Sequence, residues 1–135
     1  MMKLHAKLST EHAELTSLAD RLLRMVTADE PDPNLSQLRW RMNHVLAVHL
    51  AKEDKHLYPI LRQSSDATTR AMATKFALEM GGLCDAYTAY RDRWTHDAVV
   101  ADWRGFGDDT RTVIDLLRRR IHREETQLYR RLDAA

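Results

Sequence analysis

Three polar side chains whose types suit metal binding recur along one stretch of the chain. His49, Glu53 and His56 stand four and three residues apart. The apolar Met42 and Val45 precede them at the same kind of spacing. In a helix this spacing places all of these residues on one face, so we expect the polar ones to point into a core. An imidazole and a carboxylate at i and i+4 can reach one ion from a single helix, and such ligands suit Fe, Mn or Zn.

Other ionisable residues share apolar stripes elsewhere in the chain. His12 lies on the apolar stripe near the N-terminus, and Arg120 and Glu124 lie on the stripe near the C-terminus. Between them, Glu79 is an acid that faces inward beside apolar neighbours. Burying ionisable groups is costly unless they are paired or bind a metal. We therefore expect these side chains to contact one another or to ligate an ion.

Four stretches of helical periodicity position these residues. Apolar residues recur every three or four positions in each of them, over residues 4–26, 35–61, 66–94 and 103–132. Pro31 and Pro33 cannot continue the first helix, and Pro59 is expected to kink or close the second. Asp66 and the two serines before it offer N-cap oxygens for the third helix.

Four amphipathic helices joined by short loops predict an all-α fold, an up-down-up-down four-helix bundle. The length of 135 residues fits a single domain over residues 1–135 and is too short for two ordinary domains. An internal repeat supports the bundle. HLAKEDKHLY at 49–58 and RIHREETQLY at 120–129 each place an acidic pair shortly before Leu-Tyr near the end of a helix.

Three motifs carry a resemblance to a known family. They are His12 on the first helix, HLAKEDKHLYP at 49–59 and RIHREETQLY at 120–129. In these motifs, and in the number, order and length of its helices, the chain resembles the hemerythrin-like HHE cation-binding family. The resemblance implies a four-helix bundle that holds a non-haem di-iron centre near its axis. Members of the family bind oxygen reversibly, sense oxygen, nitric oxide or redox state, or handle iron.

Carried over residue by residue, the resemblance implies a metal site built on four side chains: His12, His49, Glu53 and Glu124. His56 is a further candidate ligand, because the spacing Glu53-x-x-His56 also occurs in di-iron carboxylate bundles. Glu79 is the acid that the third helix offers to such a site.

The chain departs from the family pattern on the third and fourth helices. Arg120 stands where the family has a histidine, and residues 66–94 contain no histidine. A guanidinium directed at Glu53 and Glu124 would replace a cation, since its planar donors satisfy carboxylates. The alternative reading is therefore a metal-free bundle in which Arg120 replaces the cation and the protein acts as a dimerisation or protein-interaction module. A third idea is an iron-dependent redox enzyme, such as a peroxidase.

Composition and charge narrow the choice of partners. Lys and Arg number 21 against 20 Asp and Glu, so the net charge of +1 gives no reason to expect nucleic acid or an acidic membrane surface as partner. No apolar run approaches the ~18 residues of a membrane span, and no signal-peptide core follows Met1. Cys84 is the single cysteine and cannot form an internal disulfide, so we expect a reducing cytoplasm.

These observations favour a cytoplasmic binding or sensing module over an enzyme. We expect iron as the cofactor, as a single ion or a di-iron centre, and a small diatomic ligand such as oxygen or nitric oxide. The alternative reading has no cofactor. A homodimer stays open under both readings, as do the metal actually loaded and the physiological ligand.

Overall fold

The computed structural model describes residues 2–134, and every regular element within them is helical. In chain order the elements are α1 (Met2–Thr27), α2 (Leu35–Lys52), η1 (Glu53–Leu57), α3 (Tyr58–Arg62), α4 (Ala67–Arg93), α5 (His96–Ala101), α6 (Trp103–Arg123), η2 (Glu124–Leu128) and α7 (Tyr129–Ala134). The elements α2, η1 and α3 follow one another without a loop and form one long helical rod, as do α6, η2 and α7. Together with α1 and α4 they make four rods, which confirms the predicted four-helix bundle.

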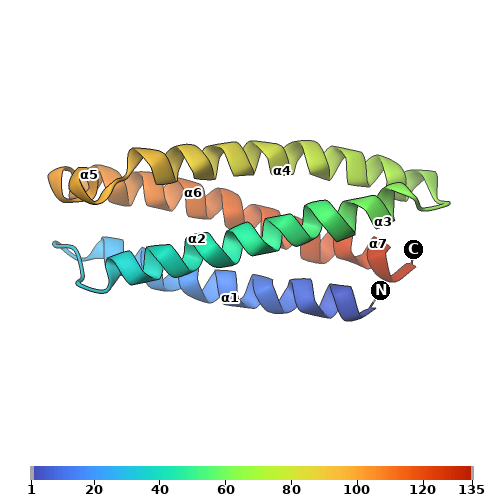
Figure 1. The fold of residues 1–135 in the computed structure, drawn as a ribbon, viewed down its shortest axis with the longest axis horizontal. Helices are drawn as coiled ribbons and strands as arrows, with labels where there is room; N and C mark the ends of the chain where they lie inside the picture. The colour runs from blue at the N-terminus through green and yellow to red at the C-terminus, as the bar shows by residue number, and fades with distance from the viewer. Residues whose placement is uncertain (1, 135) are drawn as a thin grey trace.

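The four rods lie side by side and reverse direction at each connection (Figure 1). α1 packs against α2 and α6, and α4 packs against α3 and α6. α1 begins at the same end of the bundle where α7 finishes (Figure 1). This is the up-down-up-down order predicted from the sequence. Within the described residues, no helix is long and apolar enough to cross a membrane.

Local capping chemistry determines where three of the helices begin. The side chain of Asp66 accepts a hydrogen bond from the Thr69 N–H at 3.1 Å, and Asp102 caps α6 in the same way. Thr95 caps α5 by accepting from the Ala98 N–H at 3.2 Å. The apolar pattern predicted only a turn between the third and fourth helices, because the six residues of α5 are too few to show a period.

The sequence predicts that Pro59 kinks or closes the second helix, and the rod does end within one turn of it, at Arg62. The chain stays helical through Pro59 to the end of α3, and the irregularity lies earlier, in the π-helical turn η1. There the Tyr58 N–H bonds to the Glu53 carbonyl, and in η2 the Tyr129 N–H bonds to the Glu124 carbonyl. Because η2 has no proline, the repeated sequence rather than Pro59 accounts for the π turn. Pro59 lies in the first turn of α3, a position that proline tolerates well.

The buried core is divided into two hydrophobic clusters along the bundle. On α1 the boundary between them falls between Leu8 and Leu15, and on the fourth rod it falls between Leu117 and Leu128. Five buried polar side chains occupy this boundary, and we call them the polar layer: His12, His49, Glu53, Arg120 and Glu124. π-helical turns concentrate at functional sites, and both π turns of this chain begin at a glutamate of the layer.

Candidate metal centre

The polar layer brings metal-ligating side chains from three rods to one point. His12 comes from α1 and His49 from α2, and Glu124 is the first residue of η2. One ligand atom of each lies within 4.8 Å of a ligand atom of the other two, and all three side chains are buried. Ligand atoms on opposite sides of one ion lie roughly 4 Å apart, so a single ion can contact all three after a small adjustment.

The imidazole of His12 is oriented by a carboxylate at the edge of the bundle. Its Nδ1 donates to Glu125 Oε1 at 2.7 Å. Its Nε2 therefore faces the interior, 3.1 Å from Glu124 Oε1 and 3.0 Å from the Tyr129 hydroxyl. Metal-bound histidines almost always give their other N–H to a carboxylate or carbonyl in this way.

His49 repeats this arrangement from the neighbouring rod. Its Nδ1 donates to Glu11 Oε1 at 2.8 Å, and Lys52 pairs with the other oxygen of Glu11. Its Nε2 lies 3.3 Å from Glu53 Oε1. The rings of His12 and His49 stand with their centroids 4.6 Å apart. Both Nε2 atoms are thus directed to the same interior space.

The two imidazoles differ in how easily they take up a proton. Burial and then the charge of His49 lower the pKa of His12. Burial also acts to lower the pKa of His49, but its hydrogen bond and charge interaction with Glu53, together with those of Glu11, outweigh burial and raise that pKa. The pKa of His12 is therefore the lower of the two, and the neutral imidazole is the form that binds metal.

Tyr129 closes this part of the layer. Its hydroxyl donates to Glu53 Oε2 at 3.1 Å and lies 3.4 Å from His49 Nε2. Its ring stacks on His12 with the centroids 5.0 Å apart. Burial and then the charge of Glu124 raise the pKa of Tyr129, so the phenol holds its proton. We call this part of the layer the histidine side. It consists of His12, His49 and Tyr129 and of the two acids that orient the imidazoles, Glu125 and Glu11.

Each of the two buried glutamates, Glu53 and Glu124, shifts the pKa of the other. Burial acts to raise the pKa of Glu53, but hydrogen bonding with Glu124 and His49 outweighs it and lowers the pKa to about 2. Burial and then the charge of Glu53 raise the pKa of Glu124. The pair therefore holds one proton between its two carboxylates, as closely placed acids do. Among the described residues, three buried side-chain atoms have no hydrogen-bond partner: Glu53 Oε1, Glu124 Oε2 and Arg120 Nε.

On the other side of the carboxylates lies the guanidinium of Arg120. One of its terminal nitrogens donates to the Tyr58 hydroxyl and to the Phe76 carbonyl, each at 2.6 Å. Its Nε lies 3.5 Å from Glu124 Oε2, and its carbon lies 4.7 Å from the centre of the Phe76 ring. We call Arg120, Tyr58, Phe76 and Glu79 the arginine side.

Two predicted ligands lie outside the cluster. His56 is exposed on the outer surface of η1. Glu79 is 33% exposed and pairs with Arg123, and it lies 3.4 Å from Arg120. The prediction that Arg120 faces both buried glutamates holds for one of them, since the ion pair in the structure is with Glu124.

Sequence reasoning missed four residues that shape the layer: Glu11, Glu125, Tyr58 and Tyr129. Glu11 and Glu125 each stand next to a predicted ligand, where helix geometry turns their side chains to the edge of the site. The tyrosines were visible as the last residue of each repeat. Each tyrosine stands five residues after a buried glutamate. A side chain at that spacing points into the bundle only because a π turn lies between the two residues.

The donor set of the histidine side fits one first-row transition metal ion. Two imidazoles present their Nε2 atoms, and their Nδ1 atoms are held by carboxylates. Two buried glutamates each leave an oxygen without a hydrogen bond. Buried polar atoms are nearly always satisfied. Glu124 Oε2 already lies 3.5 Å from the Arg120 Nε, so Glu53 Oε1 is the oxygen that a bound cation would satisfy. Mixed imidazole and carboxylate ligands suit iron, manganese or zinc.

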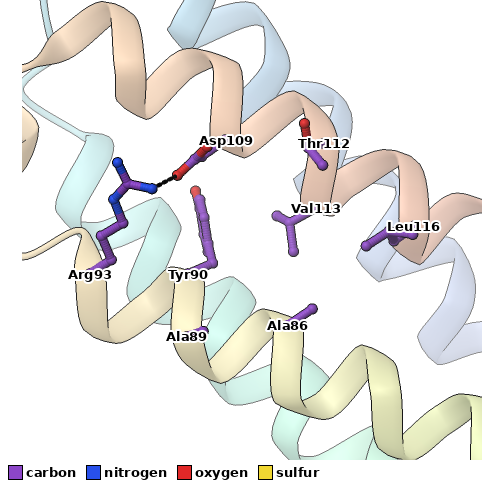
Figure 2. A pocket seen from close by; sticks show the side chains of 8 residues that line it. All are labelled: Ala86, Ala89, Tyr90, Arg93, Asp109, Thr112, Val113 and Leu116. Atoms are coloured by element: carbon purple, nitrogen blue, oxygen red, sulfur yellow. Dashed lines mark hydrogen bonds and ion pairs between the residues drawn. The ribbon is translucent and has the colours of Figure 1, made fainter.

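A second concavity elsewhere offers nothing comparable. A surface pocket of about 220 Å³ lies between α4 and α6. Figure 2 shows residues that line it, among them Ala86, Ala89, Val113 and Leu116. Its acid, Asp109, is bound to Arg93 at 3.0 Å and accepts from the Trp94 indole at 2.9 Å. No histidine lines it. The metal-binding chemistry of the described residues is thus concentrated in the polar layer.

One of three comparisons with known proteins gave a match. Searches of curated proteins and of solved structures gave no match. A family model described as the hemerythrin HHE cation binding domain matches residues 4–132, a span that includes every residue of the polar layer. With nearly its whole length matched, and with two histidines and two glutamates buried together at the centre of its bundle, the chain belongs to the hemerythrin HHE cation-binding domain family.

Proposed function

We propose that this chain binds ferrous iron in the polar layer and acts as a module that senses oxygen, nitric oxide or redox state, or that handles iron. The ligands are His12, His49, Glu53 and Glu124. The observation that supports this most directly is the convergence of two carboxylate-oriented imidazoles on two buried glutamates, of which Glu53 keeps an oxygen without a hydrogen bond. Such a set is costly to bury without a cation.

Each of these residues has a defined task in the proposal. His12 and His49 contribute neutral nitrogen ligands, and Glu125 and Glu11 hold the rings in the orientation that presents Nε2. Glu53 and Glu124 contribute negative charge and release the proton that they share. Bound iron supplies a redox-active centre with affinity for diatomic gases. Tyr129 covers the site and donates a hydrogen bond within it.

Metal content is the direct test. The protein is loaded with ferrous iron without oxygen, desalted and analysed for metal per chain. The wild-type chain is expected to retain iron, and His49→Ala is expected to lose it. His56→Ala is the matched control, since it removes an exposed histidine of the same rod and leaves the layer intact. Retention of no iron by the wild-type chain would end the proposal.

The sensing part needs a separate measurement. Oxygen or nitric oxide is added to the iron-loaded protein, and the optical spectrum is recorded. A change that is present in the wild type and His56→Ala, and absent from His49→Ala, supports gas binding at the layer. An iron-loaded protein whose spectrum is indifferent to both gases would instead favour iron handling.

One observation favours the metal-free alternative. The guanidinium of Arg120 is itself a buried cation, and its Nε lies 3.5 Å from Glu124 Oε2. In that reading Arg120 and a shared proton offset the charge of the two glutamates, and the protein acts through its surface as a dimerisation or protein-interaction module. This reading predicts that no iron is retained after loading, and that the chain self-associates or binds a protein partner.

A further inference from the structure

The internal repeat places Arg120 and His49 at equivalent positions. Each stands four residues before a buried glutamate, and each glutamate begins a π turn that is followed by a buried tyrosine. His49 faces the carboxylates from one rod, and Arg120 faces them from another. The guanidinium therefore occupies the position where a symmetrical centre would have a second imidazole.

Arg120 is held firmly in that position. Its side chain is 6% exposed, and one of its terminal nitrogens donates to both the Tyr58 hydroxyl and the Phe76 carbonyl. The ring of Phe76 lies against the face of the guanidinium, which is a favourable cation–π geometry. The Nε points to Glu124 Oε2, the oxygen that has no other partner. A cation is thus already in place beside the outer oxygen of Glu124.

No residue of the neighbouring rod α4 belongs to the buried group of candidate ligands. Its buried side chains at this height are Phe76, Met80 and Leu83, all apolar. Its acid, Glu79, is drawn outward by Arg123. A second ion on the arginine side would have to share the carboxylates of Glu53 and Glu124 with the first ion. It would also lie beside the fixed positive charge of Arg120.

The charges of the polar layer also disfavour a second metal ion. Two ionised glutamates and Arg120 together carry one net negative charge. One divalent ion leaves a single positive charge in excess, and Glu125, bound to His12, lies close enough to offset it. With the same offset from Glu125, two divalent ions would leave two positive charges in excess in a buried space, which is costly.

We propose that Arg120 acts as the second cation of this site and restricts it to a single metal ion on the histidine side. This rests on the proposed metal-binding function and adds its stoichiometry. The chain therefore differs from the di-iron centre that its family resemblance implies. Arg120 is a specificity-determining residue, since it sets the number of ions by charge and by occupied space.

The test is the ratio of metal to chain after anaerobic loading with ferrous iron. The wild type is expected to hold one ion, and Arg120→His is expected to hold two. Arg120→Lys keeps the charge and is expected to stay at one. Arg119→His is the matched control, because it adds a histidine at an exposed position of the same helix and should also stay at one. Zero ions in the wild type refutes metal binding itself.

Two outcomes would overturn the role of Arg120 while leaving metal binding intact. They are a wild-type ratio of two ions, and an Arg120→His ratio that stays at one in a folded protein. A second measurement does not depend on any variant. Wild type loaded with Mn²⁺ is expected to give the hyperfine sextet of an isolated ion in electron paramagnetic resonance, whereas the spectrum of an exchange-coupled pair would contradict the proposal.

Discussion

The two sides of the polar layer answer the same electrostatic demand in different ways. On the arginine side the chain supplies its own cation, which is hydrogen-bonded to Tyr58 and Phe76. On the histidine side the imidazoles are held in place, yet Glu53 keeps an oxygen without a partner. Both sides are built on the same repeated sequence and the same π turn. The difference between them teaches that one residue at one register decides whether a buried carboxylate faces a guanidinium or an imidazole.

The largest expected effect comes from removing the internal cation. Arg120→Leu leaves Glu124 without its counterion and the Phe76 carbonyl without its donor. Breaking one partner of a buried ion pair costs about 3–5 kcal/mol. We expect a loss of this size in the free energy of unfolding, measured by urea denaturation of the metal-free protein. Arg119→Leu, at an exposed position of the same helix, is the control and should change the free energy by no more than about 0.5 kcal/mol.

A small loss of unfolding free energy in Arg120→Leu would contradict the contrast drawn between the arginine side and the histidine side. It would mean that the glutamates are satisfied by their shared proton alone, and that the arginine side does not depend on its cation.

The next effect is the stabilisation of the histidine side by metal. A ligand that binds only the folded state at one hundred times its Kd stabilises it by about 2.7 kcal/mol. We expect ferrous iron or Zn²⁺ at that excess to raise the free energy of unfolding of the wild type by this amount. His49→Ala should show no such increase, and His56→Ala should behave as the wild type. An equal increase in all three proteins would place the bound metal outside the layer.

A smaller effect is expected from the acids that orient the imidazoles. Glu125→Gln and Glu11→Gln keep the size of the side chain but weaken the hydrogen bond to His12 or His49. Losing such a partner typically lowers metal affinity by about 10–100-fold, which we expect in a competition titration with a chelator. Glu14→Gln is the control, because Glu14 pairs with Arg41 on the surface. Unchanged affinity in both variants would show that packing alone holds the rings.

Most of the fold could be predicted from the sequence, because helical periodicity and prolines are local signals. The apolar stripes identified all four rods, and Asp66 was correctly identified as a capping residue. Two features of the fold could not be predicted from these local signals. The π turn η1 leaves no signal in the apolar periodicity, and α5 is too short to show a period.

The candidate site was predicted in part. The structure brings His12, His49, Glu53 and Glu124 to one height, which spacing alone could not establish because it says nothing about how rods are aligned along the bundle. His56 shares the stripe of His49 in a regular helix, but the π turn rotates the residues that follow Glu53. His56 is accordingly exposed. Glu79 lies on an inward stripe, yet Arg123 holds it at the edge.

The smallest effect tests which contacts hold the arginine side together. Glu79 and Arg123 form an ion pair in which both side chains are about one-third exposed, and such pairs contribute about 0.2–1 kcal/mol because water screens them. Glu79→Gln should therefore lower the free energy of unfolding by no more than about 1 kcal/mol, in contrast to Arg120→Leu. It should also leave the metal-to-chain ratio unchanged, since Arg120 keeps its bonds to Tyr58 and Phe76. A loss as large as that of Arg120→Leu, or a gain of a second ion, would show instead that Glu79 holds the guanidinium in place, and that the surface half of the arginine side controls the buried half.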